Sequence, residues 1–127
     1  MLKDTFFTIN HLADSENSRT CHITLNSSHP IFPAHFAGNP IMPGACVVQI
    51  IKELSADCFD SDFFVSAVKN MKFLQGINPL ETPDISVQLS FKQQDSEMLS
   101  VAAVLKNGDK IFTKSTLSLK KVEVQQS

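Results

Sequence analysis

One apolar segment constrains the fold of this chain more than any other feature. It follows the string HFAGNPIMPG at positions 35–44 and extends from about Ala45 to about Cys58. Apolar residues recur within it at helical spacing, at positions 45, 48, 51, 54 and 58, and Val47 and Ile50 add apolar bulk beside that stripe. A helix with so broad an apolar surface is largely buried. We therefore predict one long helix in the interior of the fold.

The rest of the chain contains six segments with the character of β-strands. In the fourth of them Ile85, Val87 and Leu89 alternate with serine and glutamine, which is typical of a strand with one buried face. Asn107 and Gly108 predict a tight hairpin. The predicted strands are 6–12, 19–25, 65–74, 84–91, 98–106 and 110–120. The pattern alone indicates an α+β fold with an antiparallel sheet.

The size and composition of the chain exclude several classes of function. Its 127 residues are enough for a single domain, spanning residues 1–127. Lys plus Arg number 11 against 13 Asp plus Glu, so we expect neither a nucleic-acid partner nor binding to an anionic membrane surface. Gln49, Lys52 and Glu53 interrupt the most apolar stretch, and no segment is therefore predicted to span a bilayer.

The three cysteines indicate a reducing compartment. Cys21, Cys46 and Cys58 are odd in number and lack the spacing of metal ligands, and the first residues of the sequence contain no apolar signal segment. We therefore expect a cytoplasmic protein without a metal site. Cys46, just inside the predicted helix, is either a packing residue or a nucleophile with a lowered pKa.

The segment before the helix has the composition of a reactive loop. Pro40 and Pro43 stiffen its backbone, and Gly38 and Gly44 permit close approach or unusual torsion angles. His35 is thereby held near the N-terminus of a helix, where backbone N–H groups point outward. An amide donor at the positive end of the helix dipole can polarise a carbonyl group, and a neutral imidazole can act as a base.

Residues 35–44 and the helix after them resemble the active-site loop and central helix of the hotdog-fold 3-hydroxyacyl-acyl-carrier-protein dehydratases. The string KFLQGINPLE at positions 72–81 resembles a second block of that family, in which a Lys-Phe strand leads into a Pro-Gly-Asp turn; here the turn reads Pro-Leu-Glu. The resemblance covers nearly the whole chain, from Phe6 to Leu119. It implies the hotdog fold, in which an antiparallel sheet wraps around one long central helix.

The resemblance also implies roles for individual residues. His35 would remove a proton from C2 of a 3-hydroxyacyl thioester, and the N–H group of Gly44 would donate a hydrogen bond to the thioester carbonyl. The substrate-binding residues implied by the same motif are Phe36, Gly38, Pro43 and Ala45. This chemistry needs no cofactor and no metal, so we expect none.

One position departs from the family pattern. Fourteen residues after His35, where the dehydratases carry a Glu or Asp that protonates the leaving hydroxyl across the dimer, this chain has Gln49. An amide can position a hydroxyl group or a water, but it cannot cycle between acid and base. Gln49 is therefore a positioning residue of the catalytic site or a polar group of the core. Glu53, one helical turn later, either replaces the missing acid or lies with Lys52 at a solvated helix edge.

Three interpretations of function follow. The first is a dehydratase of 3-hydroxyacyl thioesters, carried on acyl carrier protein or coenzyme A, in fatty-acid or polyketide/polyene-type biosynthesis. The second is a non-catalytic hotdog subunit that binds an acyl thioester beside an active partner. The third is an acyl thioesterase, because hotdog folds also host thioesterases. We expect a homodimer, a higher hotdog oligomer or a hetero-oligomer, in which His35 of one chain faces Gln49 of the other.

Overall fold

Six strands and one helix form the part of the chain that the computed structural model describes, residues 6–26 and 41–122. The helix is α2 (Gly44–Phe59). The strands are β1 (Phe7–Ser15), β2 (Ser18–Leu25), β3 (Phe63–Phe73), β4 (Asp84–Gln93), β5 (Met98–Asn107) and β6 (Lys110–Lys121). All seven elements lie where the sequence pattern predicts them, with ends displaced by no more than three residues.

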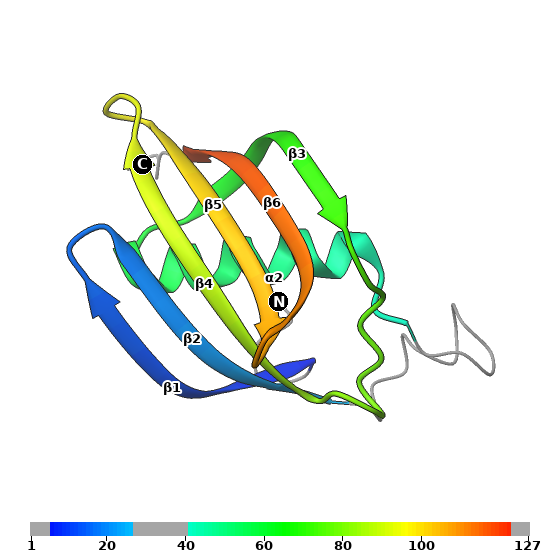
Figure 1. Cartoon of the computed structure of the whole chain (residues 1–127). Helices are drawn as coiled ribbons and strands as arrows, with labels where there is room; N and C mark the ends of the chain where they lie inside the picture. Colours follow the sequence, from blue (N-terminus) through cyan, green and yellow to red (C-terminus); the bar gives the residue numbers. More distant parts are fainter. Residues whose placement is uncertain (1–5, 27–40, 123–127) are drawn as a thin grey trace.

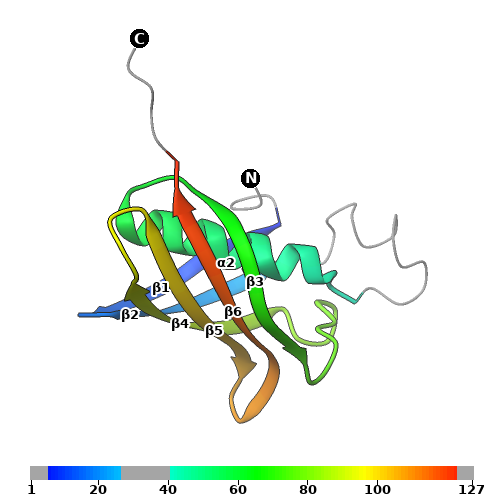
Figure 2. The ribbon, with the colours of Figure 1, turned by 90° about the horizontal axis from the view of Figure 1, so that it is seen from above.

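The strands form one sheet in the order β1-β2-β4-β5-β6-β3, and every neighbouring pair is antiparallel. The sheet curls around α2, which runs along its concave side (Figures 1 and 2). This arrangement is the predicted hotdog fold. Because β3 pairs with β6, the strand that follows the helix forms one edge of the sheet and β1 forms the other.

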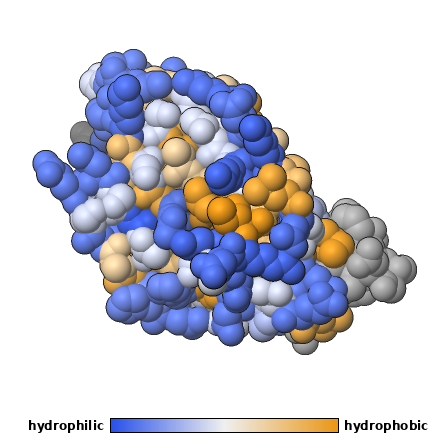
Figure 3. Space-filling model, viewed as in Figure 1, coloured by the Kyte–Doolittle hydropathy of each residue, from blue (hydrophilic) through white to orange (hydrophobic). Residues whose placement is uncertain are grey.

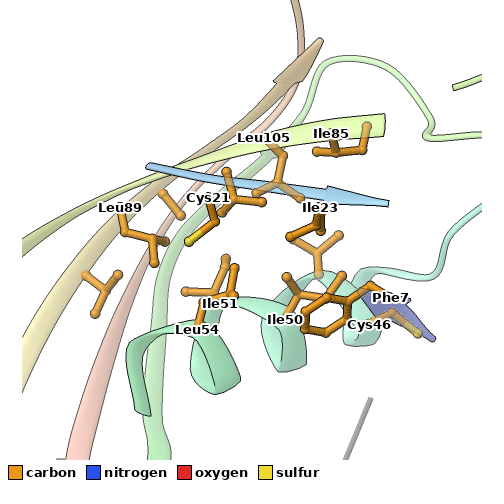
Figure 4. Close-up of a cluster of buried hydrophobic side chains, with 14 of the residues drawn as sticks. Phe7, Cys21, Ile23, Cys46, Ile50, Ile51, Leu54, Ile85, Leu89 and Leu105 are labelled. Atoms are coloured by element: carbon orange, nitrogen blue, oxygen red, sulfur yellow. The ribbon is translucent and has the colours of Figure 1, made fainter. Parts of the chain in front are cut away.

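The core lies between α2 and the concave face of the sheet. Ile50, Ile51 and Leu54 of the helix are at most 1% exposed. Figure 4 shows these side chains pointing toward inward-facing residues of three strands, namely Cys21 and Ile23 of β2, Ile85 and Leu89 of β4, and Leu105 of β5. The apolar residues that recur along α2 with the helical period therefore pack against those that recur along the strands at every second position, and together they form one apolar interior.

The hairpin between β5 and β6 turns one residue later than the sequence predicts. Asn107 pairs with Lys110, so the two turn residues are Gly108 and Asp109. Gly108 has a φ of +58°, a left-handed conformation that glycine adopts without a steric penalty. Strand β1 continues to Ser15, because its pairing with β2 extends as far as the turn.

A buried arginine fastens the C-terminal part of α2 to the sheet. Arg19 of β2 is 7% exposed. Its Nε and Nη2 atoms donate hydrogen bonds to the two carboxylate oxygens of Asp14, at 2.6 and 2.9 Å, and its Nη1 atom donates to Asp57 of α2 at 2.7 Å. The planar guanidinium group can bind both carboxylates at once, so one side chain joins β1, β2 and α2.

The convex face of the sheet is mostly hydrophilic and carries an apolar patch (Figure 3). Within residues 6–26 and 41–122, no helix is long and apolar enough to cross a membrane. The same part of the chain contains no group of three or more His, Cys, Asp or Glu side chains arranged to hold a metal ion.

Candidate active site

In the described part of the chain, no side chain caps the N-terminus of α2 at Gly44. Pro43 precedes it with φ −64° and ψ 148° and makes no side-chain capping bond, and the first turn contains no acidic residue. The carbonyl oxygen of Pro43 accepts a hydrogen bond from the N–H group of Cys46 at 3.0 Å. Because neither a capping side chain nor a carboxylate of the first turn offsets it, the positive end of the helix dipole can stabilise negative charge on a ligand oxygen.

Two segments that follow the helix in the sequence hold this helix end in place. The N–H group of Met42 donates to the carbonyl oxygen of Ile77 at 2.8 Å. At the end of β3, the ring of Phe73 approaches Gly44 so closely that a Cβ atom added to Gly44 would lie 2.9 Å from Phe73 Cζ. The glycine at position 44 therefore permits this ring to pack over the start of the helix.

A cavity of about 280 Å³ adjoins the helix N-terminus. Pro43 and Gly44 line it from the helix side, and Phe73 and Thr113 line it from the sheet side. The other residues of its largely apolar wall are Ile41, Met42, Val47, Gln75, Gly76 and Ile77. Ala45 is exposed and does not belong to the described lining of this cavity. The cavity combines an apolar wall with backbone donors at one end, which suits an acyl group with a polar carbonyl.

Gln49 lies farther along α2 and lines a different cavity, of about 470 Å³. Its side chain is half-buried, and its Nε2 atom donates a hydrogen bond to Oε2 of Glu53 at 2.9 Å. The expectation that Glu53 lies with Lys52 at a solvated helix edge is wrong. Glu53 is only 8% exposed, and the start of β3 lies beside this face of the helix. The cavity is lined by Gln49, Lys52, Glu53, Ala56, Asp57, Asp62, Phe63, Phe64 and Val122.

The structure does not bring Gly44 and Gln49 together within one chain. They are separated by a helical rise of about 7.5 Å, and they line separate cavities. The predicted base His35 and the predicted substrate contacts Phe36 and Gly38 lie outside the described residues, so their roles stay predictions.

Cys46 belongs to the core, and the alternative that it is a nucleophile with a lowered pKa is wrong. Its side chain is 5% exposed, and burial raises the pKa of its thiol. Burial is also the main reason why the pKa of Cys21 is raised to about 12. A buried thiol with a raised pKa stays protonated at neutral pH and is a poor nucleophile.

Sequence reasoning missed Ile77 and Thr113 as neighbours of the helix N-terminus. Phe73 stands in the Lys-Phe block that the sequence already indicates, but no local signal distinguishes Thr113 from the other alternating residues of β6. The pairing of β3 with β6 places it beside Phe73, with Phe73 directly opposite Thr113.

Residues 11–114 match the family model described as ApeI-like, ApeI dehydratase. Among curated proteins, the 3-hydroxyacyl-[acyl-carrier-protein] dehydratase FabZ of Caulobacter vibrioides (strain NA1000 / CB15N) is 26% identical over 110 residues. That alignment covers 80% of this chain and 67% of the Caulobacter protein.

Among solved structures, a chain of the dehydratase heterocomplex ApeI:P from Xenorhabdus doucetiae superposes with a TM-score of 0.72 at 14% identity, covering 89% of this chain and 96% of that one. A thioesterase from Haemophilus influenzae superposes with a TM-score of 0.61 at 11% identity, covering 94% and 80%. At these identities the superpositions show a shared fold, which dehydratases and thioesterases both use.

Proposed function

The chain belongs to the ApeI-like dehydratase family, and on that premise we propose that it eliminates water from 3-hydroxyacyl thioesters. The substrate is carried on acyl carrier protein or coenzyme A, and the product serves fatty-acid or polyketide/polyene-type biosynthesis. The printed name of the Caulobacter relative, a 3-hydroxyacyl-[acyl-carrier-protein] dehydratase, supports this choice of substrate class.

The observation that carries the proposal is the uncapped N-terminus of α2 beside an apolar cavity. The thioester carbonyl lies against the N–H group of Gly44, and the acyl chain extends into the cavity that Phe73 and Thr113 line. When His35 removes a proton from C2, negative charge develops on the thioester oxygen. The amide donor and the helix dipole then stabilise that charge more strongly than they stabilise the neutral carbonyl, and this difference accelerates the reaction.

The complete site requires a second chain. Gly44 and Gln49 line separate cavities in one chain, so the two walls of a site that uses both come from different subunits. Strand β3 lies at the edge of the sheet and exposes large apolar side chains, including Phe64 and Val68 at 46% and 47%. A homodimer that pairs two β3 edges covers this surface. The solved relative is titled a heterocomplex, and a hetero-oligomer would cover the same edge.

The test is incubation of the purified protein with a 3-hydroxyacyl carrier-protein thioester, followed by intact mass measurement. We expect the loss of one water from the acyl group. His35→Ala should abolish this loss while leaving the circular dichroism spectrum unchanged, because His35 is proposed as a base and not as a packing residue. Unchanged turnover in a folded His35→Ala variant would remove this histidine from the mechanism.

A second function, that of a non-catalytic binding subunit, is favoured by one observation. The residue in the family's acid position, Gln49, cannot donate a proton. If the protein binds the thioester without releasing water, and release begins only after a second hotdog protein with its own carboxylate is added, the binding subunit is the correct assignment.

A further inference from the structure

The geometry points to Glu53 as the acid that protonates the leaving hydroxyl group, with Gln49 as its positioning residue. This inference rests on the proposed dehydration. It goes beyond it by assigning the proton donor to a position one helical turn away from the one at which the family carries its Glu or Asp.

The first argument is the placement of the Glu53 carboxyl group. Residues four apart share one face of a helix, and helical side chains lean toward the N-terminus. The side chain of Glu53 follows this rule, and its Oε2 lies 2.9 Å from Nε2 of Gln49. The carboxyl group is therefore one hydrogen bond away from the amide that occupies the family's acid position. The shift of one turn along the backbone, about 5.4 Å, is largely recovered by the reach of the side chain.

The second argument is that Glu53 differs from the other carboxyl groups of the same cavity. Asp57 and Asp62 also line it, but both are exposed, and Asp57 forms an ion pair with Arg19 at 2.7 Å. Glu53 is the buried one, at 8% exposure. A carboxyl group held away from bulk water can deliver a proton to a bound hydroxyl without competition from solvent.

The third argument is the role that this arrangement leaves to Gln49. The amide donates to Oε2 of Glu53 at 2.9 Å, so Gln49 fixes the orientation of the carboxyl group. An amide at position 49 thus orients a neighbouring acid. A carboxylate there would instead face Glu53 as a like charge.

The step balances without any further reactant. The base takes a proton from C2, the electron pair of that bond forms the C2–C3 double bond, and the C3–O bond breaks. Glu53 gives its proton to the departing hydroxyl group, which leaves as water. The protonated base and the Glu53 carboxylate then exchange protons with solvent and return to their starting forms.

The test compares wild type, Glu53→Gln and Glu16→Gln on the same 3-hydroxyacyl carrier-protein thioester. Glu53→Gln is nearly isosteric and can still accept the hydrogen bond of Gln49. We expect its kcat to fall by about a hundredfold or more with KM little changed. Glu16→Gln removes an exposed carboxyl group in the turn between β1 and β2, away from this cavity, and its kcat should stay within about twofold of wild type.

The dependence of kcat on pH separates an acid from a structural residue. Because a general acid acts only in its protonated form, wild type should lose kcat as pH rises, and the residual activity of Glu53→Gln should lack that decline. The other charged groups that line the cavity, Lys52, Asp57 and Asp62, are the same in both proteins. Should Glu53→Gln not fold, Glu53→Asp replaces it, and we expect a reduced kcat from the shortened side chain.

The outcomes distinguish this inference from the proposed function. If wild type releases water and Glu53→Gln matches its kcat and pH profile, Glu53 is not the acid, while the dehydratase assignment stands. If Glu53→Gln raises KM with kcat unchanged, Glu53 acts only in binding and the inference fails. If wild type itself releases no water from any thioester, the proposed function fails and the inference fails with it.

Discussion

Two hydroxyl groups of β6 are buried without hydrogen-bond partners in the described part of the chain. They are Thr113 Oγ1 and Ser115 Oγ, and their residues are 1% and 4% exposed. A buried hydroxyl group without a partner loses its bonds to water and costs about 1–3 kcal/mol. Both residues face the helix side of the sheet, since they share the register of the buried Leu117 and Leu119.

We expect Thr113→Val to raise the free energy of unfolding by about 1 kcal/mol, because valine keeps the shape of threonine and removes the unpaired hydroxyl group. Urea unfolding measures this change, with Thr116→Val at the half-buried neighbouring position as the control. A loss of stability in Thr113→Val would mean that its hydroxyl group makes a bond in solution. A loss of activity at unchanged stability would place the hydroxyl group in substrate binding, since Thr113 lines the cavity beside Gly44.

For Gln49 and Glu53, residue type and spacing predicted where the two side chains lie on the helix. They did not predict how deeply Glu53 is buried. Helical periodicity places Glu53 outside the apolar stripe and next to Lys52, which favours exposure. Phe63 and Phe64 at the start of β3 line the same cavity as Glu53. That cavity lies between segments on either side of a turn, and no periodic pattern encodes it.

At the scale of the elements, Arg19 of β2 joins α2 to β1 through its hydrogen bonds to Asp57 and Asp14. The Arg19 guanidinium group lowers the pKa of Asp14, chiefly through its hydrogen bond to that carboxylate. A carboxyl group whose pKa is depressed in the folded state stabilises the fold above its ordinary pKa of about 3.9, and this stabilisation is lost as pH falls through the folded-state value.

Arg19→Gln should therefore be less stable than wild type at pH 6, and the difference in unfolding free energy should shrink as pH falls from about 5 to about 2. Unfolding by urea at several pH values measures this convergence. Lys92→Gln, at an exposed position of β4, removes the same charge and should follow the wild-type pH dependence. If the unfolding free energies of Arg19→Gln and wild type differ by the same amount at all pH values, Arg19 stabilises the fold through packing alone.

The two edge strands differ in a way that their sequences partly indicate. Each carries a register shift, one in β1 and two in β3. Bulges at sheet edges commonly limit pairing with other chains. Strand β1 is polar along most of its length, whereas β3 exposes Phe64, Val68 and Phe73. The apolar character of β3 therefore favours β3 as the edge that a second chain covers.

For the whole molecule, we predict that wild type is a dimer at micromolar concentration and that Val68→Arg weakens it. Val68 is near the middle of β3 and 47% exposed. A two-fold axis between paired β3 edges would bring the two introduced guanidinium groups close together, and their repulsion should raise the dimer Kd at least about tenfold. Sedimentation velocity measures the shift.

Leu80→Arg is the matched control, because Leu80 is 65% exposed in the connection between β3 and β4. It adds the same charge away from β3 and should leave the dimer intact. If wild type is a monomer with full activity, pairing through β3 is wrong, and the site is completed within one chain.

The sequence by itself determined the elements of this protein and their class of assembly. One helix too apolar to be exposed, together with strands apolar on one face, indicates an α+β fold with an antiparallel sheet, and the resemblance of residues 35–44 to the hotdog dehydratases implied that the sheet wraps around the helix. It also located Pro43 and Gly44 at the start of that helix, because proline and glycine mark such boundaries locally. These features depend on residues close together in the chain, where spacing is informative.

Only the tertiary structure decided what surrounds these residues. It placed Phe73 over Gly44 and Thr113 in the adjoining cavity, buried Glu53 against Gln49, and put Gly44 and Gln49 in separate cavities. Each of these contacts depends on the order of strands in the sheet and on side-chain packing between helix and sheet. Local propensity and periodicity carry no information about either, because both arise when segments distant in sequence bury their apolar faces against one another.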